Sequence, residues 1–270
     1  MPRANHSRAL PIALILFAWL VPVAHAQTTR IRIAAASDLQ TVMPQIAAAF
    51  EREANVRVDF TYGSSGNFFA QIRNGAPFDL FFSADSEFPS KLVQDGTAEP
   101  RSARVYALGA LVLWVPEKSG CDPRTERWEC LLKPAVQKIA IANPAHAPYG
   151  RAAISALQSA HVYDQVRTKF VLGENISQAA QFAQSGQAQA GILARSQMES
   201  PVMRTGKFWE VPKNSYAPIE QSLVILKSSK AKSAAQQFSR FVTEGQGRAI
   251  LEKAGLQPPP VLSQPQGSHK

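Results

Sequence analysis

The sequence is poor in cysteine and histidine, and its one long apolar run lies at the N-terminus. Of 270 residues, two are cysteine and five are histidine. No histidine pair at metal-binding spacing accompanies the cysteines, which argues against a zinc site. Basic residues are scattered, without a stripe of interleaved aromatics or a nucleic-acid motif. We therefore expect no nucleic-acid partner.

The first 26 residues have the pattern of an export signal. Arg3 and Arg8 precede an apolar stretch over residues 9–23, and residues 24–26 form an A-x-A cleavage site. The stretch is shorter than the about 20 residues of a membrane span, and no cysteine follows the site to accept a lipid. We expect residues 1–26 to be removed on export to the periplasm. A retained N-terminal anchor is the alternative.

Cleavage would leave 244 residues, enough for two lobes or one large domain. These carry 27 basic and 20 acidic residues, a formal charge of +7, because only Arg3 and Arg8 leave with the signal. The field of this charge would attract anions modestly, and salt would screen it. No other segment is long and apolar enough to cross a bilayer, so we expect a soluble protein.

The two cysteines, Cys121 and Cys130, have eight residues between them. An oxidising compartment favours a disulfide between them, with two reduced thiols as the alternative. Closing so short a loop would stabilise the fold by roughly 2 to 3 kcal/mol in the chain-entropy model.

Short apolar runs alternate with segments of helical spacing. The runs predict strands over residues 31–35, 56–62, 79–83, 108–115, 138–142, 169–172, 190–194 and 221–226. Most do not alternate in polarity, which is typical of strands buried on both faces of a mainly parallel sheet. The pattern as a whole predicts an α/β fold with right-handed crossovers.

Four of these runs end in a small or turn-forming residue that opens a helix. The junctions lie at Ser37 and at residues 63–66, 148–150 and 174–176. Ser37 is placed to cap the first helix. Helix N-termini present free N–H groups and a positive dipole end, and ligands of such folds bind at the carboxyl ends of strands. The junctions together predict a site for a small oxyanion.

Five segments resemble the periplasmic molybdate-binding proteins of ABC transporters. They are AAASDL at 34–39, GSSGNFFAQI at 63–72, GAPFDLFFSAD at 75–85, ANPAHAPYG at 142–150 and GENISQA at 173–179. The resemblance implies a two-lobed periplasmic-binding-protein fold of type II, each lobe a mainly parallel sheet flanked by helices. It also implies that one molybdate or tungstate dianion binds in the cleft and passes to an inner-membrane ABC permease. It implies no enzymatic activity and no cofactor.

Residue by residue, the resemblance places ligand contacts at four positions. Ser37 and Ser65 would each donate a hydroxyl and a backbone N–H, and Tyr149 and Ile176 would each donate a backbone N–H. Some family members have a ligand-binding tyrosine where this chain has Ala194. Either the site has one donor fewer, or the Tyr149 side chain compensates.

The chemistry of these donors agrees with a dianion. About five to seven neutral hydrogen bonds can replace its hydration shell, with micromolar or tighter binding. A protonated oxyanion would meet a donor with no acceptor. Since none of the four side chains titrates near neutral pH, we expect nearly constant affinity from about pH 6.5 to 9. His146 is the first candidate for any slope.

Two other functions remain open. One is the same fold serving sulfate, thiosulfate or another small anion. The other is a secreted serine hydrolase, with Ser65 as nucleophile and His146 or His161 as base. The G-S-S-G-N sequence departs from the G-x-S-x-G nucleophile elbow, because Asn67 occupies the position of the last glycine.

The resemblance also divides the chain. We expect lobe I to hold residues 27–107 and 219–256 and lobe II to hold residues 108–218, with the hinge near Gly109 and Pro218. The tail over residues 257–270, rich in proline, glutamine and serine, is expected to be disordered. We expect a monomer.

Overall fold

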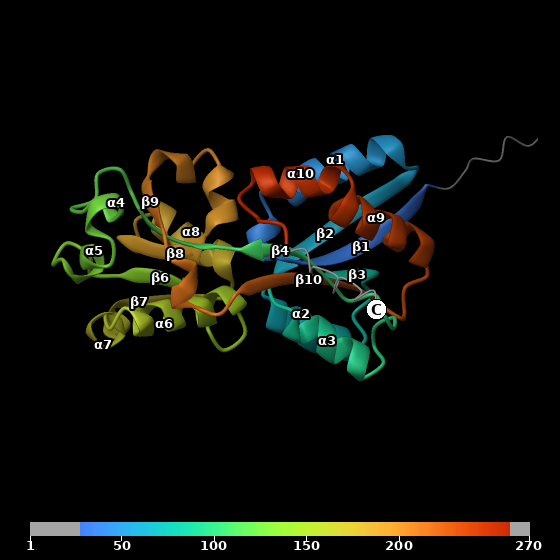
Figure 1. Ribbon diagram of the computed structural model, residues 1–270, viewed down its shortest axis with the longest axis horizontal. Helices are drawn as coiled ribbons and strands as arrows, with labels where there is room; N and C mark the ends of the chain where they lie inside the picture. The colour runs from blue at the N-terminus through green and yellow to red at the C-terminus, as the bar shows by residue number, and fades with distance from the viewer. Residues whose placement is uncertain (1–27, 260–270) are drawn as a thin grey trace, which may run out of the picture.

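Two five-stranded sheets, each flanked by helices, form a two-lobed α/β molecule (Figure 1). The computed structural model describes residues 28–259. The expected signal, residues 1–26, lies outside this range. Within it, no helix combines the length and apolarity needed to cross a membrane.

Lobe I is built on the sheet β2-β1-β3-β10-β4. Its strands are β1 (Thr29–Ala36), β2 (Val56–Gly63), β3 (Leu80–Ser83), β4 (Arg104–Gly109) and β10 (Ile219–Ile225). One face carries α1 (Met43–Glu53), α9 (Lys232–Glu244) and α10 (Gln246–Lys253), and the other carries α2 (Ser65–Arg73) and α3 (Glu87–Gln94) (Figure 1). A short 3₁₀ helix, η1 (Ser37–Leu39), follows β1.

Lobe II repeats this plan on the sheet β7-β6-β8-β5-β9. Its strands are β5 (Leu111–Val115), β6 (Ile139–Ala142), β7 (Phe170–Gly173), β8 (Ala190–Ala194) and β9 (Lys207–Glu210). Its helices are α4 (Pro123–Glu126), α5 (Glu129–Leu132), α6 (Pro148–Ser159), α7 (Tyr163–Val166) and α8 (Ile176–Gln184). Four 3₁₀ segments complete it: η2 (Arg167–Lys169), η3 (Arg195–Glu199), η4 (Met203–Thr205) and η5 (Lys213–Ser215).

Each sheet has one strand that runs against the others. In lobe I, β10 is antiparallel to both neighbours, while β1 pairs in parallel with β2 and β3. In lobe II, β5 is antiparallel to both neighbours, while β6 pairs in parallel with β7 and β8. The reversed strand is in each case the one that enters from the other lobe. Most strands of each sheet run in the same direction, which confirms the expectation of mainly parallel sheets. Each sheet nevertheless contains both parallel and antiparallel pairs.

The single strand predicted over residues 108–115 is wrong. The chain leaves the first sheet after Gly109 and enters the second at Leu111. The apolar run is continuous because both ends are buried, one in each lobe, so composition does not mark the crossing. The return crossing ends at Ile219, which pairs with Gly109. Strand β9, an edge strand of mixed polarity, was not predicted.

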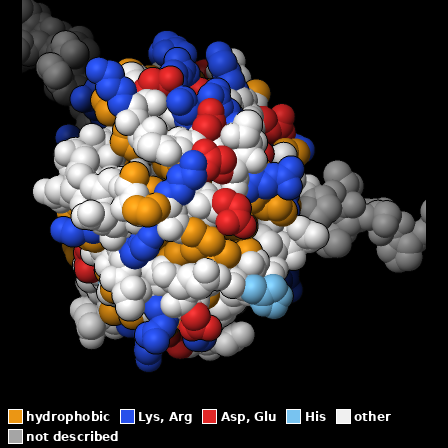
Figure 2. Space-filling view, turned by 90° about the vertical axis from the view of Figure 1, so that its left-hand side faces the viewer, with side chains coloured by type: hydrophobic (Ala, Val, Ile, Leu, Met, Phe, Trp, Pro, Cys, Tyr) orange, Lys and Arg blue, Asp and Glu red, His pale blue; other side chains and the backbone are white. Residues whose placement is uncertain are grey.

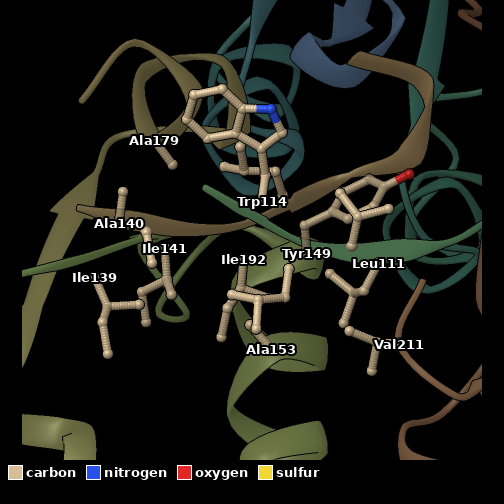
Figure 3. Close-up of a cluster of buried hydrophobic side chains, with 14 of the residues drawn as sticks. Leu111, Trp114, Ile139, Ala140, Ile141, Tyr149, Ala153, Ala179, Ile192 and Val211 are labelled. Carbon is tan, nitrogen blue, oxygen red and sulfur yellow. The ribbon is translucent and has the colours of Figure 1, made fainter. Parts of the chain in front are cut away.

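Each lobe has its own apolar core. In lobe I the rings of Phe50 and Phe82 pack around Phe238, with centroids 5.1 and 6.0 Å from it. In lobe II, Ile139 and Ile192 lie on the side of the sheet that α6 covers, and Trp114 lies on the opposite side (Figure 3). These cores fix the strands whose carboxyl ends face the other lobe.

The predicted disulfide is confirmed, since Cys121 and Cys130 are bonded. It ties α5, which contains Cys130, to the loop before α4, which contains Cys121, at the outer end of lobe II (Figure 1). The expectation of a disordered tail from residue 257 is wrong at Gln257. Its backbone N–H donates to Leu108 at 3.0 Å and its carbonyl accepts from Leu108 at 2.7 Å, because extended backbone there pairs with β4. Residues 260–270 lie outside the described range.

Candidate functional site

The four predicted junctions meet at one cavity between the lobes. Ser37 and Ser65 line it from lobe I, and Tyr149 and Ile176 line it from lobe II. All four are buried, with exposed fractions between 1% and 4%. The cavity has a volume of about 10 Å³, which is room for about one water-sized sphere. The structure thus brings together all four residues that the sequence motifs single out.

The lobe I wall presents two hydroxyl groups. Ser37 is the first residue of η1 and not the cap expected from the sequence, because Ala36 occupies the capping position. Its Oγ accepts from the N–H of Ser177 at 3.3 Å, and the Oγ of Ser65 accepts from the N–H of Ala84 at 2.9 Å. Since each oxygen accepts from the protein, each hydroxyl proton is left to donate.

The lobe II wall presents two helix N-termini. Tyr149 is the second residue of α6, and Ile176 is the first residue of α8. At these positions a backbone N–H has no acceptor within its own helix. Asn175 caps α8 by accepting from Ser177 and Gln178, which leaves the N–H of Ile176 uncommitted to the cap. Two positive dipole ends therefore point into one cavity.

The side chain of Tyr149 serves the protein and not the cavity. Its ring lies beside Leu111 at the edge of the lobe II core, and its hydroxyl points away from that core (Figure 3). The hydroxyl donates to Asp38 Oδ2 at 3.1 Å and accepts from Gln221 Nε2 at 3.0 Å. A hydroxyl has one proton to give. This commitment of the proton to Asp38 favours the alternative that the site has one donor fewer, and compensation for Ala194 by the Tyr149 side chain stays a hypothesis.

Asp38 is the residue at this site that sequence reasoning missed. It is fully buried, lines the cavity through its position after Ser37, and accepts at Oδ2 from Tyr149 and Gln221. Its other oxygen, Oδ1, has no hydrogen-bond partner among the described residues. Burial raises the pKa of its carboxyl to about 7, although its hydrogen bonds to Gln221 and Tyr149 act to lower the pKa. The quoted AAASDL segment contained this residue, but nothing in the segment showed its burial.

His146 bridges the lobes at the rim of the cavity. Its carbonyl accepts from Gly66 N–H at 3.0 Å and from Ser64 Oγ at 2.7 Å, and its Nδ1 lies 2.9 Å from Ser64 Oγ. Its Nε2 lies 3.6 Å from Glu174 Oε2, and the other oxygen of that carboxylate accepts from Asn67 Nδ2. These contacts hold the two walls together in a closed arrangement.

The hydrolase arrangement is not assembled around Ser65. Its Oγ is bonded to Ala84, and the histidine at the cavity pairs with Ser64 instead. His161 lies after α6, exposed and in a left-handed conformation, away from the cavity lining. No serine–histidine pair therefore forms at the residue proposed as nucleophile.

The cavity lining has no lysine or arginine, and Asp38 is its one acidic residue. Asp85 and Arg151 form an ion pair between the lobes, with Arg151 Nη2 2.7 Å from Asp85 Oδ2. Neither residue lines the cavity. Figure 2 shows basic and acidic side chains interspersed over the outer end of lobe II. In the part of the chain that is described, no group of three or more potential ligands could hold a metal ion. The arrangement suits an oxyanion held by hydrogen bonds to its oxygens.

Comparison with known proteins decides the family. The family model for bacterial extracellular solute-binding proteins matches residues 31–257. This chain belongs to that family. The solute-binding protein is 35% identical to the molybdate-binding protein ModA of Rhodobacter capsulatus over 254 residues, which are 94% of this chain and 97% of the relative. It is also 35% identical to ModA of Azotobacter vinelandii over 231 residues, 85% of this chain and 90% of that relative.

The solved structure of the Azotobacter vinelandii periplasmic molybdate-binding protein superposes on this solute-binding protein with a TM-score of 0.79 at 33% identity. The match covers 85% of this chain and 99% of that one. The family resemblance seen in the sequence motifs and the two-lobed fold are thereby confirmed. The identity of the anion contacts in this chain stays a prediction.

Proposed function

We propose that this protein captures molybdate in the periplasm and delivers it to an ABC permease in the inner membrane. The observation that carries this proposal is the convergence of Ser37, Ser65, Tyr149 and Ile176 on one cavity between the lobes. The relatives at 35% identity are named as molybdate-binding proteins, and none of the names is that of an enzyme. The protein acts as a binding protein without a cofactor.

The donor set favours a fully deprotonated oxyanion. Hydroxyl and backbone N–H groups converge on the cavity, and its walls carry no cation. A dianion such as molybdate accepts at every oxygen, so it can use all of these donors. Tungstate has the same charge and nearly the same size, and we propose it as a second ligand. Sulfate is smaller, so donors placed for molybdate would reach it only through stretched hydrogen bonds.

Binding requires the lobes to move. A tetrahedral oxyanion is larger than the about 10 Å³ that the cavity offers, so the walls must separate to admit one. We propose that residues 27–107 and 219–256 move as lobe I against residues 108–218. The hinge would lie near Gly109 and Pro218, where the chain crosses between sheets. We further propose a monomer that is exported through cleavage of residues 1–26.

Thermal unfolding of residues 27–270 with molybdate, tungstate, sulfate or phosphate tests the proposal. A ligand at about 1,000 times its Kd adds roughly 4 kcal/mol of stability, which raises Tm by several degrees. We expect a rise with molybdate and tungstate and none with sulfate or phosphate. Ser65→Ala should shrink the rise, whereas Ser185→Ala, at an exposed position after α8, should leave it unchanged. A rise with sulfate alone would redirect the assignment to another oxyanion.

A further inference from the structure

Asp38 lies under the anion cavity without a cation to balance it. Three elements pack their side chains against it: α6 through Tyr149, β10 through Gln221 and η3 through Ser196, whose Oγ donates to the Asp38 carbonyl at 2.9 Å. Behind Gln221, Tyr106 of β4 donates to the Gln221 Oε1 at 2.6 Å. Each of these contacts is neutral.

The charged and titratable groups of the surrounding elements are committed elsewhere. Arg195 on η3 binds Glu199 and Glu210, and Arg151 on α6 binds Asp85. Burial raises the pKa of Tyr149 and of Tyr106 well above the ordinary value, so both rings stay uncharged. His146 on the opposite wall contacts Ser64 and Glu174. Among the described residues, no lysine, arginine or histidine bonds to Asp38.

An ionised Asp38 would therefore oppose the ligand. A buried carboxylate that lines a cavity repels a dianion bound there, and the cavity lining supplies no lysine or arginine to offset the repulsion. The repulsion disappears when the carboxyl holds a proton. Oδ2 already accepts two hydrogen bonds, so the proton belongs on Oδ1, the oxygen without a partner.

We propose that Asp38 controls anion affinity by holding a proton in the liganded protein, so that capture of a dianion in mildly alkaline solution takes up one proton from the solvent. This inference rests on the proposed function. It replaces the flat pH profile expected from the four donors alone, because the titrating group lies behind the donors and not among them. Linkage then requires affinity to fall as pH rises above neutrality.

Calorimetric titration of residues 27–270 with molybdate from pH 6 to 9 tests this inference. Molybdate remains a dianion over this range, so its own protonation adds no slope. We expect affinity to be nearly constant below neutral pH and to fall up to tenfold per pH unit above it. At pH 8.5, two buffers of different ionisation enthalpy should report uptake of about one proton per anion bound.

Asp38→Asn removes the titration and keeps an acceptor oxygen for Tyr149 and Gln221. We expect this variant to bind molybdate with neither a pH slope nor proton uptake. His146→Asn is the matched control at the other titratable group of the site, and it should keep both. If Asp38→Asn does not fold, the number of protons taken up per anion by the wild-type protein and by His146→Asn still tests the inference.

Two results would overturn the inference while leaving the proposed function intact. One is molybdate binding by the wild-type protein without proton uptake. The other is a slope that persists in Asp38→Asn or vanishes in His146→Asn. Absence of molybdate binding at every pH would instead overturn the proposed function, and this inference with it.

Discussion

The ionisation of Asp38 also sets how the folded protein responds to pH without a ligand. Burial raises the pKa of this carboxyl from 3.8 to about 7, so the folded state holds the proton more tightly than the unfolded state. The stability that this proton confers is fully present below the unfolded value and is lost as pH rises through about 7. Between pH 5 and 8 the loss is about 2 to 3 kcal/mol, at about 1.4 kcal/mol per pH unit.

Asp38→Asn does not titrate and should escape this loss. We expect the Tm of the variant relative to wild type to rise by about 5 to 10 °C between pH 5 and pH 8. Thermal unfolding of both proteins in matched ionic strength measures it. The comparison cancels the other titrating groups, which the two proteins share. A difference that stays constant with pH would show that the carboxyl does not titrate in this range.

Tyr149 has a backbone role at the cavity and a side-chain role behind it. Tyr149→Phe removes one of the two donors to Asp38 and leaves Gln221 without its acceptor at the hydroxyl. We expect a loss of about 1 to 3 kcal/mol of stability with little change in molybdate affinity, because the backbone N–H remains. Urea unfolding and titration measure the two effects. Tyr163→Phe on α7 is the control, and a large affinity loss in Tyr149→Phe alone would assign the hydroxyl to the ligand.

Among single residues, the sequence predicts positions at strand–helix junctions better than it predicts a buried acceptor such as Asp38. Ser37, Ser65, Tyr149 and Ile176 stand in local strand–turn–helix patterns, so their place at a helix N-terminus follows from neighbours in the chain. The environment of Asp38 comes from Tyr149 and Gln221, which are 111 and 183 residues away. No local pattern carries that information.

Among the elements, α2 sets how closely the lobes approach. Gly66, its second residue, lies against His146 of lobe II, and a Cβ built there would stand 2.7 Å from the His146 carbonyl oxygen. The clash is with backbone across the cleft, so the neighbour has little freedom to yield. We expect Gly66→Ala to fold normally and to lower molybdate affinity about tenfold or more, because overpacking costs roughly 1 to 3 kcal/mol.

Titration calorimetry and ligand-free Tm separate the two effects of Gly66→Ala. Asn67→Ala is the matched control, since it removes a contact with Glu174 across the same rim and introduces no clash. It should weaken binding less. Equal affinity in Gly66→Ala and wild type would mean that the bound state is more open at this rim than the structure shows.

The disulfide belongs to the outer end of lobe II. Cys121 and Cys130 are both buried there, near β9, the edge strand of the sheet. A Cys121→Ala/Cys130→Ala double variant should lose about 2 to 3 kcal/mol of stability through the freed unfolded chain. Its molybdate affinity should match wild type, because the cavity is built from other loops. Denaturant unfolding and calorimetry test both parts, and a fall in affinity would couple this loop to the cleft.

Elements were predicted well where the chain pattern is local and poorly where it is not. Residues 190–194 form the predicted strand, β8, because a short apolar run bounded by polar segments is typical of a buried strand. The run over residues 108–115 contains two strands, since being buried in lobe I and being buried in lobe II demand the same side chains. The hinge is therefore invisible in composition.

The whole molecule is held closed by contacts on several sides of the cavity. His146 lies against the turn before α2, Ser177 donates its hydroxyl to the Ser37 carbonyl at 2.8 Å, and Thr41 donates to the Ser196 carbonyl at 3.1 Å. Most of these contacts join neutral groups. Among the described residues, Asp85 and Arg151 form the ion pair that joins the two lobes, and it adds to the hydrogen bonds between them.

The Asp85–Arg151 pair should set the lifetime of the closed state. Arg151 Nη2 lies 2.7 Å from Asp85 Oδ2, and its guanidinium lies 5.7 Å from the centre of the Phe88 ring. Burial raises the pKa of Asp85, whereas hydrogen bonds and the charge of Arg151 oppose the rise. Opening the cleft separates the pair and hydrates both groups. Its loss should therefore speed ligand release much more than it slows capture.

We expect Arg151→Gln to raise the molybdate dissociation rate several-fold with a nearly unchanged association rate, measured by stopped-flow tryptophan fluorescence. Combined with Asp85→Asn, it should show a coupling energy of about 0.5 to 3 kcal/mol in the dissociation rate. Arg30→Gln is the control, because its ion pair with Asp59 at 2.7 Å lies on the surface of lobe I alone. Additive effects of Arg151→Gln and Asp85→Asn would mean that the two side chains act independently, and that closure depends on the neutral contacts around the cavity.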